Sequence, residues 1–310
     1  MLYQTWLNIW LENYIKPFLK LRTYVKYRQI VYNHIVGGLG KNELKNLTPA
    51  LLQEFVTSLL NCGNIKTFNG LSSNSVNSVV TVLQSSLKTA YNLGYIKEYI
   101  GDRVVRPKII EKRIECFSVA EQKEIERFCL NSDKKKLYGI VICLYTGLRI
   151  GELLALKYSD VNFETSVLSV TKTCYDTPQG RVLDTPKTHS SIRIIPLPKP
   201  ILNLIKQLKK DSFCDYLIED KQKPVAIRSY QRTFELLLKK LNISHKGFHS
   251  LRHTFATRAL ECGMDVKTLS ELLGHKNTNI TLNRYVHSMF EHKVEMMNRL
   301  AKVMGKITLE

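Results

Sequence analysis

A pair of histidines at helical spacing, with an arginine between them, is the first feature of the chain that could perform chemistry. In HSLRHTFATRAL (residues 249–260), His249 and His253 are four positions apart and Arg252 directly precedes the second. This spacing places both imidazoles on one helix face, as in the zinc-binding helix of metalloproteases. Ser250, however, stands where such enzymes need a glutamate base, and the charge of Arg252 would repel zinc. We therefore expect no metal at this helix.

Three further polar residues stand beside apolar helical segments. Arg149 follows the apolar run YGIVICLYTGL with Glu152 one turn later, His275 comes directly after Gly274, and Tyr285 lies ten residues beyond His275. Each has an ordinary structural explanation by itself. A buried arginine usually pairs with a carboxylate such as Glu152, a histidine at a helix end complements the helix dipole, and a single tyrosine on a helix is usually a core residue.

Taken together, these residues have the composition of a phosphate-transfer site. Arg149 and Arg252 offer permanently charged, bidentate donors suited to a phosphodiester. His249 and His275 can donate to phosphate oxygens or transfer a proton near neutral pH. The Tyr285 hydroxyl is a nucleophile once it loses its proton. Because no carboxylate cluster accompanies them, we expect the protein itself to stabilise the charge, without a metal ion or a cofactor.

The charge of the chain indicates a polyanionic partner. Its 310 residues carry a net charge of +19, and both parts contribute: residues 1–112 hold 14 Lys and Arg against 6 Asp and Glu, and the remainder holds 32 against 21. Anionic lipid would favour a concentrated basic block or an amphipathic anchor, and the sequence has neither. Nucleic acid is the better candidate, and a lysine-rich but merely soluble surface is the remaining alternative.

The composition is that of a globular protein. Apolar residues make up 44% of the chain and charged residues 24%, and no apolar run is long enough to span a membrane. The N-terminus lacks the pattern of a signal peptide. The seven cysteines are scattered without a C-x-x-C pair, which argues against a disulfide framework or a zinc ribbon. We expect a cytoplasmic protein that does not associate with membranes.

The N-terminal third of the chain has the spacing of a small helical bundle. Thr48 followed by Pro49 is a helix start signal, and Gly94 is expected to close the last helix. The glycines of GGLG (residues 37–40) are expected to break the second helix. The expected helices span residues 5–16, 23–36, 47–60 and 72–94.

The remaining two thirds combine helices with a few strands. Residues 103–117 are basic, contain one proline and have no sustained period, which is typical of an interdomain linker. Ser118 and Glu121 then form a capping-box pattern. Strand patterns occur only in 166–176, 181–184 and 191–197, which predicts one small antiparallel sheet. Helices are expected over 119–130, 135–156 (interrupted at residues 146–147), 228–241, 249–263, 265–274 and 279–300.

Three motifs resemble those of one known family. TGLRIGELLAL, HSLRHTFATRAL and LLGHKNTNITLNRY, in this order, are similar to the catalytic domain of tyrosine recombinases, the phage integrase family. The sequences of TPKTHSSIRIIPLP and of the last motif resemble those of integrases of conjugative transposons and phages of Gram-positive bacteria. The resemblance implies a mainly α fold with a small antiparallel β-sheet and two domains that form a C-shaped DNA clamp. Its parts would be a core-binding helical domain (1–102), a basic linker (103–117), a catalytic domain (118–290) and a C-terminal helix or tail (291–310).

The resemblance also implies a role for each site residue. Tyr285 would attack the scissile phosphate and form a 3′-phosphotyrosyl bond. Arg149 and Arg252 would hold the nonbridging oxygens, and His249 and His275 would complete the phosphate pocket. His249 would also accept the tyrosine proton.

Two other residues match family positions, and a third has no counterpart. Lys187, in the turn TPKTHS, matches the hairpin lysine that acts as general acid toward the leaving 5′-oxygen. Glu152 matches an acidic residue that supports the first arginine. His253 has no catalytic counterpart, and we expect it to be structural.

The function implied is a site-specific recombinase that integrates or excises a mobile element through a Holliday junction. The implied partners are double-stranded DNA with core-type sites, a homotetramer on two such sites, and excision or DNA-bending accessory proteins; the implied location is the bacterial cytoplasm, in association with the nucleoid. The tail would either pack on its own domain or be exchanged between subunits.

Several alternatives remain open within and outside this chemistry. A Xer-type recombinase that resolves replicon dimers is the near alternative. It is favoured because the chain begins with the core-binding bundle instead of an arm-binding domain, unless the chain is a shortened form, and it is opposed by the sequences of the motifs. A type IB topoisomerase and a non-cleaving DNA-binding regulator with the same fold are further alternatives.

Overall fold

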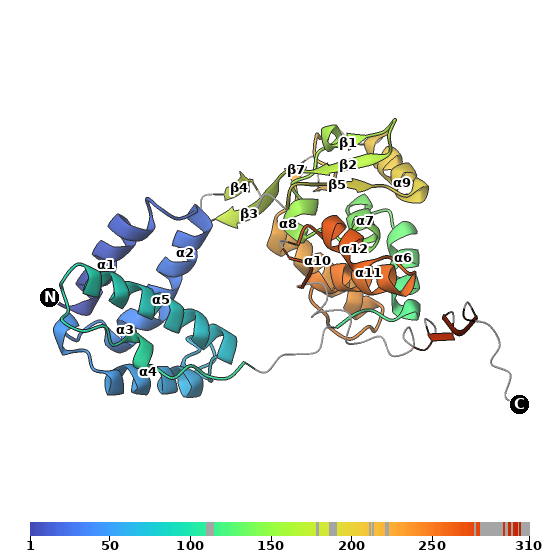
Figure 1. Ribbon diagram of the computed structural model, residues 1–310. Coiled ribbons are helices and arrows are strands. Elements are labelled where there is room, and N and C mark those ends of the chain that lie inside the picture. The colour runs from blue at the N-terminus through green and yellow to red at the C-terminus, as the bar shows by residue number, and fades with distance from the viewer. Residues whose placement is uncertain are drawn as a thin grey trace, which may run out of the picture. The chain divides into compact units, whose positions relative to one another are not determined.

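The computed structural model divides the chain into two compact units, Met1–Lys112 and Arg113–Glu310 (Figure 1). It describes residues 1–109, 115–177, 180–185, 191–210, 212, 214–220, 223–275, 277–279, 294, 297, 298, 300–302 and 304. Each unit has its own hydrophobic core. Among the described helices, none is long and apolar enough to cross a lipid bilayer.

The first unit is entirely helical in its regular elements. Residues buried along one face of each helix form the shared core, in which Trp6 and Trp10 are fully buried. Their indole N–H groups donate to the Ser86 carbonyl and to Thr89 Oγ1, both at 3.1 Å, so the aromatic anchors also satisfy their polar atoms. The elements are α1 (Tyr3–Trp10), a π-helical turn (Leu11–Ile15), α2 (Leu21–Ile30), a second π-helical turn (Val31–Ile35), α3 (Val36–Leu39), α4 (Pro49–Cys62), α5 (Ser73–Asn92) and 3₁₀ turns at Leu44–Asn46 and Gly101–Arg103.

The expected bundle is confirmed, and the helix break expected at GGLG comes only at its last glycine, Gly40. The chain continues as helix through Gly37 and Gly38, within α3. A Cβ at Gly38 would lie 2.5 Å from the Phe55 ring of α4, so this glycine permits close packing and does not end the helix. The start signal at Thr48 is confirmed, because its hydroxyl accepts a hydrogen bond from the Leu51 N–H.

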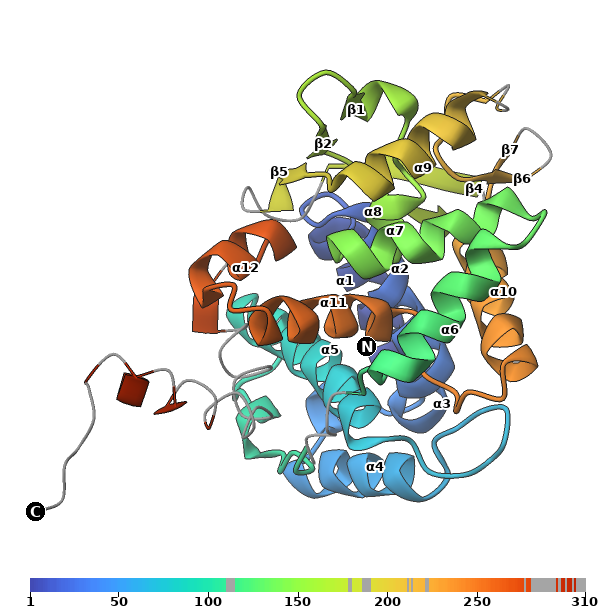
Figure 2. The ribbon, with the colours of Figure 1, turned by 90° about the vertical axis from the view of Figure 1, so that its right-hand side faces the viewer.

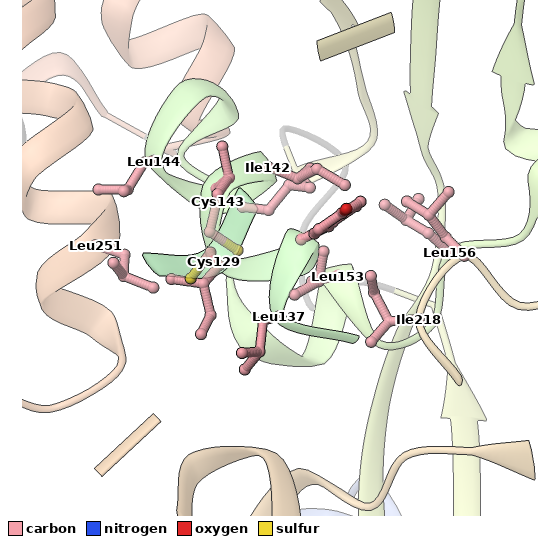
Figure 3. Close-up of a cluster of buried hydrophobic side chains, with 14 of the residues drawn as sticks. Cys129, Leu137, Ile142, Cys143, Leu144, Leu153, Leu156, Ile218 and Leu251 are labelled. Atoms are coloured by element: carbon pink, nitrogen blue, oxygen red, sulfur yellow. The ribbon is translucent and has the colours of Figure 1, made fainter. Parts of the chain in front are cut away.

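The second unit is built mainly of helices around a large apolar core. Figure 3 shows part of this core, where Cys143 and Ile142 lie among leucines from several elements. Its helices are α6 (Val119–Leu130), α7 (Tyr138–Thr146), α8 (Ile150–Leu153), α9 (Lys199–Lys210), α10 (Ile227–Lys240), α11 (His249–Glu261) and α12 (Val266–Leu273), with 3₁₀ turns at Lys135–Leu137 and Tyr158–Asp160. The Ser118–Glu121 capping box at the start of α6 is confirmed. The helix expected over 279–300 lies almost entirely outside the described residues.

Three small antiparallel sheets replace the single sheet expected from the sequence. The run 166–176 divides into two strands that belong to different sheets. β2 (Val167–Val170) lies between β1 (Val161–Asn162) and β5 (Arg193–Pro196), whereas β3 (Thr173–Thr177) pairs, among the described residues, with β4 (Gly180–Asp184) alone. A third pair, β6 (Glu219–Asp220) with β7 (Lys223–Pro224), was not expected. The sequence pattern detects extended backbone, but the pairing depends on tertiary contacts.

α11 is the central helix for the candidate site. It packs against α7 and against α12, as Figures 1 and 2 show. α12 in turn packs against β5, and α8 packs against β3. Through these contacts α7, α8, α11, α12 and β5 lie close together in the second unit.

Candidate active site

The turn between α7 and α8 presents Arg149. α7 ends at Gly147, whose φ of +63° is the left-handed conformation that glycine adopts without strain. A Cβ there would also lie 2.5 Å from the Phe255 ring of α11 and 2.8 Å from Leu273 of α12. Gly147 therefore permits both the turn and the close approach of three helices. Two residues later, Arg149 is extended and precedes α8 with its side chain about one third exposed.

Glu152 is the buried anion of the site. Its carboxylate accepts hydrogen bonds from the backbone N–H of Arg149 (2.9 Å), from Arg149 Nη1 (2.7 Å) and from both Nη atoms of Arg193 (3.2 and 2.9 Å). Its side chain is 3% exposed. The pairing of Arg149 with Glu152 that the sequence suggested is thus confirmed, but the carboxylate is shared with a second arginine from β5.

The pKa of Glu152 shows which effect dominates in this cluster. Burial alone raises the pKa of a carboxyl group. The hydrogen bonds and charges of Arg193 and Arg149 outweigh burial and lower the pKa of Glu152 to about 2. The carboxylate therefore stays ionised throughout the neutral range and holds both guanidinium groups.

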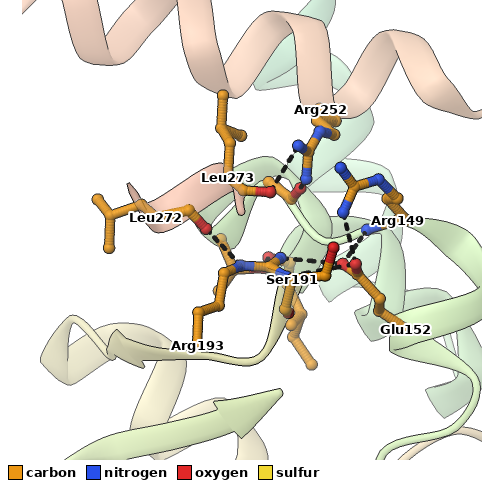
Figure 4. Close-up of polar contacts among 10 residues, drawn as sticks. Arg149, Glu152, Ser191, Arg193, Arg252, Leu272 and Leu273 are labelled. Carbon is orange, nitrogen blue, oxygen red and sulfur yellow. Dashed lines mark hydrogen bonds and ion pairs between the residues drawn. The ribbon is translucent and has the colours of Figure 1, made fainter. Parts of the chain in front are cut away.

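Arg252 is one of the most deeply buried large side chains, with 1% of the residue exposed. Its Nη1 donates to the Gly147 carbonyl (2.8 Å) and its Nη2 to the Leu273 carbonyl (2.6 Å). These two partners are neutral, so they orient the guanidinium without cancelling its charge. Arg252 thereby connects the α7–α8 turn with the C-terminal end of α12 (Figure 4).

Arg193 is the residue that sequence reasoning missed. Besides Glu152, it binds the Leu272 carbonyl through Nε (2.6 Å) and the Ser191 carbonyl through Nη1 (3.2 Å). A signal was present in the segment SIRIIPL, where strand alternation places Arg193 and Ile195 on the same face. The structure places both inward, whereas Ile194 is 63% exposed. An arginine on the buried face of a strand requires a partner.

Three histidines belong to the helices of this site: His249 and His253 lie on α11, and His275 follows α12. His249 is exposed at the first position of α11, and its ring meets that of the half-buried His253 edge to face, with 4.6 Å between ring centroids. His275 is half-buried and follows the left-handed Gly274 that ends α12; its backbone N–H donates to the Ser270 carbonyl at 3.0 Å. The bonds of Arg193 and Arg252 to Leu272 and Leu273 thus fix the helix end from which His275 follows.

The described site carries a net positive charge. Arg149, Glu152, Arg193 and Arg252, which we call the arginine cluster, carry three positive charges and one negative charge. Lys187 and Tyr285, expected as general acid and nucleophile, lie outside the described residues. Within the described part of the chain, no group of three or more His, Cys, Asp or Glu residues is arranged to hold a metal ion.

The chain matches two domain models of one family. Residues 118–292 match the phage integrase family, and residues 2–60 match the N-terminal SAM-like domain of phage integrases. A tyrosine recombinase XerC-like protein of Caldanaerobacter subterraneus subsp. tengcongensis is 29% identical, over 95% of this chain and 82% of the relative. The ICEBs1 integrase of Bacillus subtilis is 25% identical, over 89% of this chain and 77% of the relative.

A solved structure agrees with these sequence matches. The integrase of transposon Tn1549, in complex with a circular intermediate DNA, superimposes with a TM-score of 0.80 and 25% identity, covering 97% of this chain and all of that one. Both units of the chain are included at this coverage. The protein therefore belongs to the phage integrase family of tyrosine recombinases, whose chemistry is the cleavage and rejoining of DNA strands.

Proposed function

We propose that the protein is a site-specific DNA recombinase, an integrase that inserts and excises a mobile element through a 3′-phosphotyrosyl intermediate and a Holliday junction. The observation that carries this proposal is the arginine cluster. Arg149 comes from the α7–α8 turn and Arg252 from α11, and fixed partners orient both: Glu152 for the first, and the carbonyls of Gly147 and Leu273 for the second. Two oriented guanidiniums are suited to the nonbridging oxygens of a phosphodiester.

The proposed reaction conserves bond energy. The Tyr285 oxygen attacks the scissile phosphorus while His249 accepts the phenolic proton. The bond from phosphorus to the 5′-oxygen breaks, and Lys187 protonates that oxygen. A phosphotyrosyl ester replaces the original ester, so a 5′-hydroxyl from another strand can reverse the step without ATP. The guanidinium groups stabilise the charge that develops on the phosphoryl oxygens, the role that a metal ion takes in other phosphoryl-transfer enzymes.

Each segment of the chain has its own part in this proposed function. Residues 1–102 are the core-binding domain, 103–117 the basic linker, 118–290 the catalytic domain and 291–310 a tail that acts in subunit assembly. Both domains contact the duplex, because each holds a surplus of positive charge for DNA phosphates. Complete exchange between two duplexes cuts four strands, so four copies with one Tyr285 each form the active assembly. Excision or DNA-bending proteins assist it, and the reaction takes place on the bacterial chromosome in the cytoplasm.

A second candidate function has one specific observation in its favour. The relative aligned over 95% of this chain is described as XerC-like, and a Xer-type recombinase would resolve replicon dimers with the same chemistry. The resemblance to the ICEBs1 and Tn1549 integrases favours the mobile-element role. Mapping whether the chromosomal gene lies between repeated element ends distinguishes these two roles.

A suicide substrate tests the proposed chemistry. A duplex that carries the cognate core site, with a nick one base from the scissile phosphate, loses a short fragment after cleavage and traps the covalent complex. In the presence of EDTA we expect a protein–DNA adduct with the wild type, none with Tyr285→Phe, and a normal amount with Tyr145→Phe. Tyr145 is a matched control because it is a partly exposed tyrosine of the same unit whose hydroxyl binds Glu126.

Three outcomes would contradict the proposal. Loss of the adduct on chelation would disprove the metal-independent mechanism. An adduct with Tyr285→Phe would show that another residue is the nucleophile. Specific DNA binding without any adduct from the wild type would favour the non-cleaving regulator.

A further inference from the structure

Arg193 stands where the supports of two proposed catalytic residues, Arg149 and His275, meet. Its guanidinium binds Glu152, which also holds Arg149; the Leu272 carbonyl, which belongs to the end of α12 just before His275; and the Ser191 carbonyl. Ser191 directly follows the segment 186–190 that carries Lys187. With a side chain only 5% exposed, Arg193 is fixed by protein contacts on all of these sides.

We propose that Arg193 is a positioning residue of strand cleavage, which shares Glu152 with Arg149 so that the carboxylate offsets less of the attraction between Arg149 and the phosphate, and which fixes the helix end next to His275. This inference rests on the proposed function. Arg193 itself does not touch DNA, because it is buried on the inner face of β5.

The charge sharing follows from the geometry of the carboxylate. Glu152 Oε1 lies 2.7 Å from Arg149 Nη1 and 3.2 Å from Arg193 Nη1, and Oε2 lies 2.9 Å from both Arg193 Nη2 and the Arg149 backbone N–H. One negative charge is thus divided between two guanidiniums. Without Arg193, no second guanidinium would offset the negative potential of this buried carboxylate near Arg149, and this potential is strong because water is excluded. Arg149 would then attract a phosphate less.

The bond of Arg193 to the Leu272 carbonyl explains how Arg193 would fix the end of α12. The last carbonyls of a helix lack intrahelical partners, and a guanidinium that donates to one of them satisfies it and fixes the helix end. Arg193 does this at Leu272, and Arg252 does it at Leu273. A small displacement of His275 would be enough to impair the reaction, because a misplacement of about 1 Å can cost roughly 100-fold in rate.

The test compares single-turnover cleavage of the suicide substrate by four proteins. We expect Arg193→Met to reduce the cleavage rate by about 10- to 100-fold, with core-site affinity within about threefold of the wild type. The double variant Arg193→Met/Glu152→Gln should recover about tenfold over Arg193→Met, because it removes the excess negative charge on Arg149. The double variant also avoids an unpaired buried carboxylate, so it remains informative where the single variant folds poorly.

Arg258→Met is the matched control. Arg258 lies on α11 of the same unit. Like Arg193, it binds a carbonyl (that of Phe117, at 2.9 Å) and a carboxylate (that of Glu261). None of its hydrogen bonds within the described residues goes to Glu152 or to α12. We expect this variant to lose stability while it retains cleavage by the folded fraction. Equal rates for Arg193→Met and wild type, equal losses for the two single variants, or no recovery in the double variant would each overturn the inference.

A second measurement separates this inference from the proposed function. Amide hydrogen exchange on the free protein should be faster in the last turn of α12 in Arg193→Met than in Arg258→Met, independently of any DNA reaction. If the wild type forms no adduct, the proposed function fails. If exchange in α12 is the same in all variants, the positioning role of Arg193 fails, whatever the protein cleaves.

Discussion

Arg193 and Arg252 hold consecutive backbone carbonyls at the same helix end. The Leu272 carbonyl accepts from Arg193 Nε at 2.6 Å, and the Leu273 carbonyl accepts from Arg252 Nη2 at 2.6 Å (Figure 4). The two arginines reach α12 from different elements, β5 and α11. Because the other contacts of these arginines include Glu152 and the Gly147 carbonyl, the end of α12 and the α7–α8 turn form one connected polar structure.

Replacing Arg252 by lysine should impair cleavage although it keeps the charge. A lysine ammonium is a point donor and cannot reproduce the planar contact that spans the carbonyls of Gly147 and Leu273. We expect Arg252→Lys to slow covalent-adduct formation by about 100- to 1,000-fold, a loss typical of an oriented donor at the transition state. Single-turnover kinetics at saturating protein measure this. Arg258→Lys on the same helix is the control, and a loss of similar size in that variant would point to misfolding of α11 instead.

The two histidines of α11 should differ sharply in their contribution. His249 is exposed at the helix start, whereas His253 is half-buried one turn later. We expect His249→Ala to slow cleavage by about 100-fold or more, the usual size of a general acid–base contribution. His253→Ala should stay within about threefold of the wild type, since this half-buried ring packs edge to face against His249 and takes no part in the proposed reaction. Equal losses in the two variants would mean that both imidazoles act in the reaction.

Most of the fold could be predicted from local sequence patterns. Thr48 with Pro49, Ser118 with Glu121, and the glycine at 147 gave correct helix boundaries, because each acts on its own turn of backbone. The patterns failed where the cause is tertiary. Gly38 remains helical because Phe55 requires the space, and the strands of 166–176 separate into two sheets through contacts with distant segments.

The site shows the same division between local and distant causes. The pairing of Arg149 with Glu152 is an i,i+3 relationship and was foreseeable. The third member of the cluster, Arg193, is 41 residues from Glu152, and no spacing rule connects them. The inward orientation of Arg193 could be read from strand alternation, but its partners on α8 and α12 depend on how these elements pack.

Because the pKa of Glu152 is low, the contribution of this residue to the free energy of unfolding should depend on pH. The pKa falls from 4.5 in an ordinary environment to about 2 in the folded protein. Such a group stabilises the fold fully above pH 4.5, by about 3 kcal/mol, and this stabilisation is lost as the pH falls toward 2. We expect Glu152→Gln to lower the free energy of unfolding by about this amount at pH 7 and by much less at pH 3.

Denaturant unfolding monitored by circular dichroism at several pH values measures this difference. Glu271→Gln, at an exposed glutamate of α12, is the control and should match the wild type at each pH. A stability difference between Glu152→Gln and the wild type that is the same at pH 3 and pH 7 would show that the ionised carboxylate is not the source of the effect.

Gly151 holds α8 against β3 and should not tolerate a methyl group. A Cβ at this position would lie 2.7 Å from the Cys174 carbonyl oxygen and 2.7 Å from Thr173 Oγ1, and the first of these is backbone that cannot rotate away. We expect Gly151→Ala to lower the free energy of unfolding by about 1–3 kcal/mol, as overpacking does, and to slow cleavage because α8 carries Glu152.

Gly37→Ala is the matched control: Gly37 is an exposed helical glycine with no atom within 4 Å of the added Cβ, and alanine there should stabilise α3 slightly. Thermal unfolding of both variants, with adduct formation at a temperature where each is folded, distinguishes displacement of the cluster from a general loss of stability. Unchanged cleavage in a destabilised Gly151→Ala protein would show that the position of α8 does not control Arg149.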